Sequence, residues 1–322
     1  MERPWWLPAL LVPLGVFLAS FFGAFAYDAL ILTPHAAVPA STATSSPSGA
    51  AAPTLGNALA TPPPPVTSAP EPPEAPSDLV YTFNVPGILD EAASPTESTS
   101  PFWFLDSGGR LIMGGGVGET IQGALPAEDP WRKAYARTSA TDTDGGRYPQ
   151  NLFRLVTKQA WSDSREELSY RIVRDELTDS PNRNSSNGLL LMSRYQSGAT
   201  LYYAGIRVDG SAVIKKKYDG TYYTLAELPL FSGTYDRASA PNLLPHGTWL
   251  RLRLDTVTEA DGNVQLSLYL TDASQPAWLL IASATDVPGR YGGTPTITAP
   301  GRAGVRTDFM DVAFSDFRVH PL

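Results

Sequence analysis

The sequence predicts an all-β protein: an antiparallel, two-sheet β-sandwich (jelly roll), preceded by an N-terminal transmembrane helix and a disordered, proline-rich linker. Two observations predict the sandwich. After Leu79, one segment after another alternates apolar and polar residues with a period of two, which is typical of half-buried strands. No long amphipathic helix separates these segments, and a run of strands without alternating helices indicates a sandwich. The predicted parts of the chain are residues 1–32, 33–78 and 79–322.

The N-terminal segment predicts a membrane anchor. Residues 4–27 carry no charge over 24 positions, and about 20 apolar residues are enough to cross a bilayer as a helix. Trp5 and Trp6 stand at one end, where interfacial aromatic residues are favoured. The alternative is a signal peptide that is cleaved near Ala26, after which the protein is secreted. Both alternatives place the C-terminal domain outside the cytoplasm, either anchored to the membrane or released.

The linker prediction rests on composition. Residues 33–78 contain 12 prolines in 46 positions and no aromatic residue. Such a stretch cannot bury enough apolar surface to fold alone, and its proline runs favour an extended spacer. We therefore expect a spacer that holds the following domain away from the membrane or the cell wall.

Charge and cysteine content narrow the function of residues 79–322. The whole chain has 32 acidic and 24 basic residues; five acids and one base precede Leu79, which leaves 27 acids against 23 bases. A mildly acidic domain argues against a nucleic-acid partner, which would require a basic surface. The chain has no cysteine, so disulfides, thiol nucleophiles and thiolate metal sites are excluded together.

The predicted strands fill the domain and are punctuated by turn dipeptides such as Asp209–Gly210 and Asp219–Gly220. They are residues 80–85, 152–158, 168–174, 201–208, 212–218, 221–228, 249–257, 264–270, 278–284, 303–307 and 310–319. The glycine-rich stretch 112–120 lacks the lysine of a phosphate loop and is interpreted as a flexible turn. The lysine run Lys215–Lys217 cannot face one way, because strand neighbours alternate, and we expect it to be solvated.

Several of these segments resemble the concanavalin A-like lectin/glucanase superfamily, with a LamG-like jelly roll. They are "YYAGIRVDGSAVIKKKYDGTYYTLAE", "GTWLRLRLD", "DGNVQLSLYL", "WLLIASATD" and "GRAGVRTDFMDVAFSDFRV". The resemblance is at the level of the fold and is best over residues 188–322. It implies carbohydrate as a partner, but lectins, hydrolases, lyases and inert spacer modules share this sandwich, so the fold leaves the function open.

Alternation along the strands predicts a candidate binding groove. In 201–208, residues such as Tyr202 and Ile206 require the core, which places Tyr203 and Arg207 on the opposite face. Guanidinium groups bind carboxylates in a bidentate manner, so arginines gathered on one face would suit an anionic glycan. The alternative is a solvated face on which the arginines pair with neighbouring acids. The candidate glycan-binding residues are Gln150, Asn151, Arg154, Arg171, Arg194, Tyr203 and Arg207.

Catalytic and metal sites of this fold would show as particular residue patterns in the sequence. The Glu-x-Asp-x-x-Glu pattern of glucanases is absent, so no catalytic residue is assigned. "LYYAGIR" resembles one strand of alginate lyases, and this resemblance implies Tyr203 and Arg171 as the catalytic residues if the protein is a lyase; the Gln-x-His of those enzymes is missing. We expect no organic cofactor. Asp308, Asp311 and Asp316 are candidate calcium ligands, since carboxylate oxygens suit calcium; the alternative is that they are turn and edge-strand acids.

Three functions remain open from the sequence. The favoured one is a membrane-anchored extracytoplasmic module that binds a polysaccharide or cell-envelope glycan without catalysis. The second is a polysaccharide lyase or another carbohydrate-active enzyme of the same fold. The third is a structural envelope or adhesion domain without a small ligand.

Overall fold

The computed structural model describes residues 77–272 and 275–322. The predicted anchor at 4–27 and the predicted linker up to residue 76 lie outside this part of the chain. Within the described residues, none of the helices combines the length and the apolar character needed to span a bilayer.

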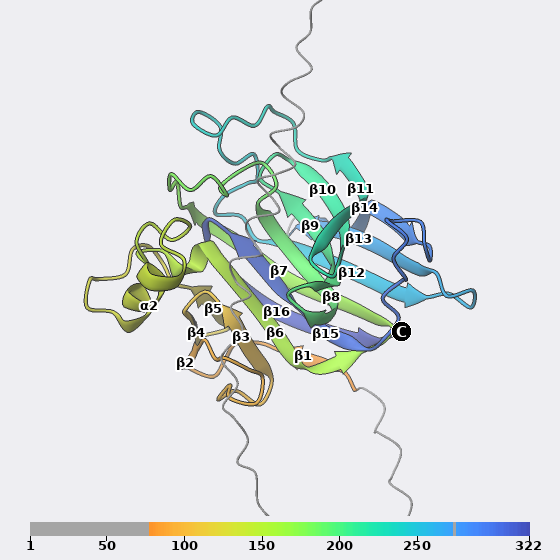
Figure 1. Cartoon of the computed structure of the whole chain (residues 1–322), viewed down its shortest axis with the longest axis horizontal. Coiled ribbons are helices and arrows are strands. Elements are labelled where there is room, and N and C mark those ends of the chain that lie inside the picture. Colours follow the sequence, from red (N-terminus) through yellow and green to blue (C-terminus); the bar gives the residue numbers. More distant parts are fainter. Residues whose placement is uncertain (1–76, 273–274) are drawn as a thin grey trace, which may run out of the picture. The chain divides into compact units, whose positions relative to one another are not determined.

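Two antiparallel sheets make up the described domain, as the alternating pattern predicts (Figure 1). The larger, sheet A, runs in the order β14-β13-β12-β7-β16-β5-β4-β2, and β1 pairs with β16. Its strands are β1 (Leu79–Tyr81), β2 (Gly87–Asp90), β4 (Arg110–Gly114), β5 (Val117–Thr120), β7 (Ser164–Asp175), β12 (Leu250–Thr258), β13 (Val264–Asp272), β14 (Gln275–Asp286) and β16 (Met310–Pro321).

The smaller sheet, sheet B, has the order β11-β10-β9-β8-β15-β6-β3. Its strands are β3 (Trp103–Ser107), β6 (Leu152–Trp161), β8 (Gly188–Ser197), β9 (Thr200–Arg207), β10 (Ser211–Tyr218), β11 (Thr221–Pro229) and β15 (Gly301–Asp308). The last strands in chain order, β15 and β16, lie inside the two sheets and not at their edges. Figure 1 shows both of them, in the blue end of the colour range, between strands from much earlier in the sequence.

The main core lies between the sheets and is built by alternation. In β9, Tyr202, Ala204 and Ile206 all belong to this core, as the sequence predicts, and Val208 after the strand joins them. Large rings such as Trp103, which has no exposed surface, fill the same layer. Because hydrophobic burial contributes roughly 25 cal/mol per Å² of apolar surface, this layer is the main source of the domain's stability.

The outer face of sheet B is also buried, which alternation alone does not predict. Leu201 and Tyr203, on the side of β9 away from the main core, join Leu190, Met192 and Val213 in a second apolar cluster. Every residue from Leu201 to Arg207 is consequently buried. The candidate site forms beside this cluster.

Two local elements differ from the sequence prediction. The stretch 112–120 is not a flexible turn, because it forms the strands β4 and β5, which pair with each other around three glycines with positive φ. A short helix, α2 (Pro130–Thr138), follows Asp129, whose carboxylate accepts a 2.8 Å hydrogen bond from the Trp131 amide. This cap and the proline at the first helical position are ordinary helix-start signals. A single 3₁₀ turn, η1 (Pro149–Asn151), leads into β6.

Candidate anion-binding site

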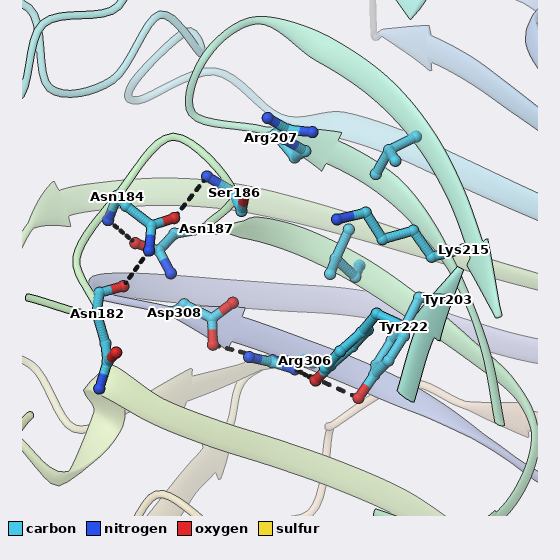
Figure 2. Close-up of a pocket in the computed structure, with 12 residues that line it drawn as sticks. Asn182, Asn184, Ser186, Asn187, Tyr203, Arg207, Lys215, Tyr222, Arg306 and Asp308 are labelled. Atoms are coloured by element: carbon cyan, nitrogen blue, oxygen red, sulfur yellow. Dashed lines mark hydrogen bonds and ion pairs between the residues drawn. The ribbon is translucent and has the colours of Figure 1, made fainter. Parts of the chain in front are cut away.

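A pocket opens on the outer face of sheet B, where β9, β10, β11 and β15 lie beside the loop that precedes β8. Its cavity measures about 90 Å³. Figure 2 shows the side chains that surround it. They are Asn182, Asn184, Ser186, Asn187, Leu190, Tyr203, Arg207, Val213, Lys215, Tyr222, Arg306 and Asp308, which together we call the Lys215 pocket.

Three cations and one carboxylate line this pocket. Arg306 Nε lies 2.9 Å from Asp308 Oδ1, so this guanidinium is held by a carboxylate inside the pocket. Arg207 pairs with Asp209, two residues further along the chain. The Nη1 atom of Arg207 also lies 2.9 Å from Glu227 Oε2 on β11. The two guanidiniums are therefore fixed in place by acids before any ligand arrives.

Lys215 differs from both arginines. Within the described part of the chain, its ammonium makes no hydrogen bond and no ion pair. Burial, followed by repulsion from Arg207, lowers the pKa of Lys215 to about 8. Figure 2 shows its side chain extending from β10 into the pocket. A half-buried ammonium without a partner, close to two guanidiniums, makes the pocket attractive to an anion.

Two stacked tyrosines form one wall of the pocket. The Tyr203 and Tyr222 rings lie 6.2 Å apart with an interplanar angle of 18°. Arg306 Nη1 donates to both phenolic oxygens, over 3.3 Å and 3.4 Å (Figure 2). Tyr203 is only 1% exposed, whereas Tyr222 is half-buried, so Tyr222 is the phenol that a ligand reaches more readily.

The opposite wall is an asparagine-rich loop, residues 182–187. Asn184 Nδ2 donates to the Asn182 carbonyl over 3.1 Å, and Asn184 Oδ1 accepts from the Ser186 amide over 2.8 Å. Asn187 Oδ1 in turn accepts from the Asn184 amide over 2.6 Å. These side-chain-to-backbone bonds, which asparagine favours in turns, shape the loop and bring amide groups to the pocket.

The structure brings together two of the predicted binding residues, Tyr203 and Arg207. Arg154 lies on the same face of sheet B but outside the pocket. Its Nη1 lies 2.7 Å from Asp106 Oδ2, an oxygen that also accepts from the Tyr195 hydroxyl over 3.0 Å. Arg154 thus belongs to a separate buried ion pair.

The predicted gathering of four arginines on one face is wrong. Arg171 lies on β7 in sheet A, where its guanidinium covers the Trp249 ring at 4.9 Å; it cannot act beside Tyr203 as the lyase resemblance implied. Arg194 has a φ of 49° at a register shift in β8, which breaks the alternation. Its fully buried side chain lies 2.8 Å from Asp163 and donates to the Ile297 carbonyl over 2.6 Å. Burial lowers the pKa of Arg194.

Gln150 and Asn151, in the 3₁₀ turn η1, are fully buried and lie outside the pocket. Gln150 Nε2 donates to Asp311 over 2.9 Å and to the Gly123 carbonyl over 3.1 Å. Asn151 Nδ2 donates to the Asp142 carbonyl over 2.7 Å. Both amides therefore hold loops together on the way into β6.

The candidate calcium ligands do not converge. Asp308 pairs with Arg306, and Asp311 lies 2.8 Å from Arg174 Nη2. Asp316 lies further along β16, where its Oδ2 accepts a 3.3 Å hydrogen bond from the Ser315 hydroxyl. No group of three or more potential metal-ligating His, Cys, Asp or Glu side chains occurs among the residues described.

Sequence reasoning missed Lys215, Tyr222, Arg306 and the asparagine loop. The lysine run is not solvated as predicted, because Lys216 has no exposed surface and Lys217 is 1% exposed. Two signals were present. Alternation puts Arg306 and Asp308 on one face of their strand, and "PNRNSSN" concentrates residues that form turns and offer polar groups.

Comparison with known proteins gives matches among solved structures alone. No family model matches the chain, and neither does any curated protein. A carbohydrate-binding module, CBM66 from Bacillus subtilis, matches with 16% identity over 52% of this chain and 81% of its own, at a TM-score of 0.36. A lichenase from a mouse hindgut metagenome matches with 6% identity over 76% of this chain and 100% of its own, at 0.39.

A further match is the PL-14 alginate lyase from Aplysia kurodai, with 6% identity over 73% of this chain and 98% of its own, at a TM-score of 0.35. All three matches have low identity and low TM-scores, so they are similarities and nothing more. The strand order of the described residues confirms the predicted antiparallel, two-sheet sandwich.

Proposed function

We propose that the domain binds an anionic glycan in the Lys215 pocket. The observation that carries this proposal is the ammonium of Lys215, which lies half-buried beside two guanidiniums and makes no ion pair with any described residue. A carboxylate or sulfate in the pocket would supply the missing negative charge through charge-assisted hydrogen bonds. The Tyr222 ring and the loop amides of residues 182–187 offer a stacking surface and hydrogen-bonding groups for the rest of a sugar.

The cellular setting belongs to the same proposal. We propose that residues 4–27 anchor the protein in a membrane and that residues 33–78 hold the domain on the outer side, where it meets cell-envelope or environmental polysaccharide. The alternative, release after cleavage near Ala26, leaves the ligand proposal unchanged.

A binding comparison with the full chain tests the ligand proposal. Oligosaccharides of equal length, one acidic and one neutral, are titrated against the protein at low and at high salt. We expect the acidic sugar alone to bind, and salt to weaken its binding. Lys215→Met should weaken binding about 10- to 100-fold, because a hydrogen bond to a charged group contributes about 1.5–3 kcal/mol.

Lys133→Met is the matched control, since Lys133 is an exposed lysine on α2 and does not line the pocket. It should leave the affinity unchanged. Equal binding of neutral and acidic sugars, or an equal loss in the two lysine variants, would count against an anion-binding pocket.

A second candidate function, β-elimination of a uronate chain, has one specific observation in its favour. The Tyr203 and Tyr222 phenols share one arginine donor at the pocket that holds the Lys215 amine. A lyase must remove the proton next to the sugar carboxylate and protonate the departing glycosidic oxygen, and phenols can perform this acid–base work. Incubation with polyuronate distinguishes the two functions. A lyase generates an unsaturated product that Tyr222→Phe abolishes while affinity persists, whereas a binding module generates none.

A further inference from the structure

An ion pair is sealed between the two sheets, away from the Lys215 pocket. Lys216 points inward from β10 of sheet B, and Asp286 ends β14 of sheet A. Lys216 Nζ lies 2.8 Å from Asp286 Oδ2, and both side chains have 0% exposed surface. The two residues therefore join the sheets across the core at one side of the sandwich, where β10 contacts β14.

The surroundings of the pair are specific. The Tyr202 hydroxyl donates to Asp286 Oδ2 over 2.6 Å and accepts from the Ile297 amide over 3.0 Å. Lys216 Nζ also donates to the Pro295 carbonyl over 2.6 Å. The other carboxylate oxygen, Asp286 Oδ1, is buried and has no hydrogen-bond partner among the described atoms.

A charged pair with one unsatisfied carboxylate oxygen is unfavourable in such a place. Removing both charges from water costs several kcal/mol per ion, and this cost is balanced only when every lone pair finds a partner. Proton transfer from the Lys216 ammonium to the Asp286 carboxylate removes both charges. It leaves a primary amine in contact with a carboxylic acid, which are the two reactants of amide condensation.

We propose that Lys216 and Asp286 condense to form an intramolecular amide that links the two sheets. The lone pair of Lys216 Nζ attacks Asp286 Cγ, and the hydrogen bond from Tyr202 stabilises the negative charge that develops on Oδ2. The bond from Cγ to Oδ1 then breaks. Oδ1 leaves as water with the proton of the acid and one hydrogen of the amine. No oxidant or other reactant is consumed.

The product fits the surrounding groups better than the ion pair does. The amide oxygen keeps the hydrogen bond from Tyr202, and the amide N–H keeps the Pro295 carbonyl as its acceptor. The orphan oxygen is no longer present. In a chain without cysteine, this bond would restrict the unfolded chain in the manner of a disulfide, by closing the stretch from residue 216 to residue 286.

Peptide mapping of the full chain tests the proposal. The protein is denatured, digested with a protease that cleaves after glutamate, so that the lysine run 215–217 stays within one peptide, and analysed by mass spectrometry. We expect the linear peptides that contain Lys216 and Asp286 to be replaced by one branched peptide, lighter than their sum by one water molecule. Recovery of both linear peptides from the wild-type protein in full yield would overturn the proposal, whatever the variants do.

Two lysine variants locate the bond. Lys216→Arg keeps a positive charge but should abolish the branched peptide, whereas Lys217→Arg, at the neighbouring position, should retain it. Tyr202→Phe removes the donor to Asp286 Oδ2 and should reduce the fraction of branched peptide. A branched peptide that persists in Lys216→Arg would assign the bond to another pair and refute this assignment.

Discussion

Lys215 lies in surroundings that disfavour its charged form, yet its pKa of about 8 leaves most of the side chain charged at neutral pH. Burial and the neighbouring Arg207 disfavour the ammonium, and the more weakly acting Glu227 and Asp209 do not form an ion pair with it. Such a conflict is typical of a residue whose partner is a ligand and not part of the chain. In the proposed complex, Lys215 would therefore stabilise the bound state more than it stabilises the free protein.

The pKa of Lys215 sets a pH dependence of stability in the absence of ligand. Its pKa is about 8 in the folded protein and near its ordinary value of 10.5 in the unfolded chain. Between these values the unfolded chain binds more protons, so the free energy of unfolding rises with pH in this window. Chemical denaturation at a series of pH values should show this rise for the wild type and not for Lys215→Met. Affinity for an acidic sugar should fall above pH 8, as the ammonium is lost.

The position of a single side chain was predictable from the sequence where its strand alternates regularly and where the compared residues lie in the same sheet. Tyr203 and Arg207 follow directly from the core residues of β9. Arg194 could not be placed, because a left-handed φ turned its side chain inward. Arg171 could not be placed either, because alternation gives the face of a strand but not the sheet to which the strand belongs.

At the scale of elements, the β8–β9 hairpin that supports the pocket depends on a close backbone approach. A Cβ added to Gly205 would lie 2.1 Å from the Leu189 carbonyl oxygen, on the neighbouring strand. Backbone cannot move aside as a flexible side chain can, so the ladder between the two strands must open.

Gly205→Ala should therefore lower the free energy of unfolding by about 2–3 kcal/mol, as overpacking commonly does. Gly87→Ala is the matched control in an edge strand, since nothing lies within 4 Å of an added Cβ there. It should change stability by less than about 0.5 kcal/mol, the range of ordinary surface substitutions. Equal effects in urea denaturation would contradict the close approach.

A carboxyl pair lies at the end of β7, before the asparagine loop begins. Arg174 Nη2 lies 2.7 Å from Glu176 and 2.8 Å from Asp311. Burial, followed by repulsion from Asp311, raises the pKa of Glu176 to about 7, and burial also raises the pKa of Asp311. The Glu176 amide donates to the Phe309 carbonyl over 2.9 Å, so the pair is tied to the turn between β15 and β16.

Glu176 should make the domain more stable in mild acid. Its folded pKa is raised, so the folded protein binds more protons than the unfolded chain between pH 4.5 and about 7. The free energy of unfolding should therefore fall as pH rises through this window. Glu176→Gln should reduce that fall and stabilise the protein at pH 8, whereas Glu128→Gln, at an exposed position, should do neither. Denaturant titrations at both ends of the window measure the difference.

Elements were predictable where they are long. The strands after residue 150 have strong period-two patterns and ladders of many pairs. The short strands β2 to β5 were missed, because four or five residues carry too little periodicity and three of these strands contain a glycine. The loop walls of the pocket have no periodicity, so only their composition could indicate them.

At the scale of the whole molecule, the N-terminal boundary of the sandwich is defined by a few contacts. The Ser77 carbonyl accepts from Trp161 Nε1 over 3.2 Å and from Gln159 over 2.9 Å. Asp78 lies 3.0 Å from His320, and Leu79 pairs with Val319 in the ladder between β1 and β16.

A fragment of residues 77–322 should consequently fold with one cooperative transition and a β-type circular dichroism spectrum. A fragment that starts at residue 82 lacks β1 and should unfold at a lower temperature, because Leu79 and Tyr81 no longer cover the aromatic residues beneath them. Identical transitions for the two fragments would show that β1 contributes nothing to the fold.

The sandwich class was predictable as a whole, because the number of strands and the lack of long helices leave few alternatives. The buried outer face of sheet B was not. Its apolar cluster gathers residues that are distant in sequence, such as Phe104 of β3 and Tyr203 of β9, with the partly buried Ala92 packed against them. The residue pattern of a single strand cannot predict that both of its faces are buried.

The central positions of β15 and β16 determine when the domain can assemble. Both a ribosome and a secretion channel deliver a chain from its N-terminal end, and β7 and β5 have no common neighbour until residues 310–321 have emerged. In sheet B, β8 and β6 likewise lack the strand between them until residues 301–308 have been synthesised. Neither sheet can therefore be completed before its last strand in chain order is available. The order of strands in the sequence thus delays closure of the sandwich until nearly all of the described residues have been synthesised.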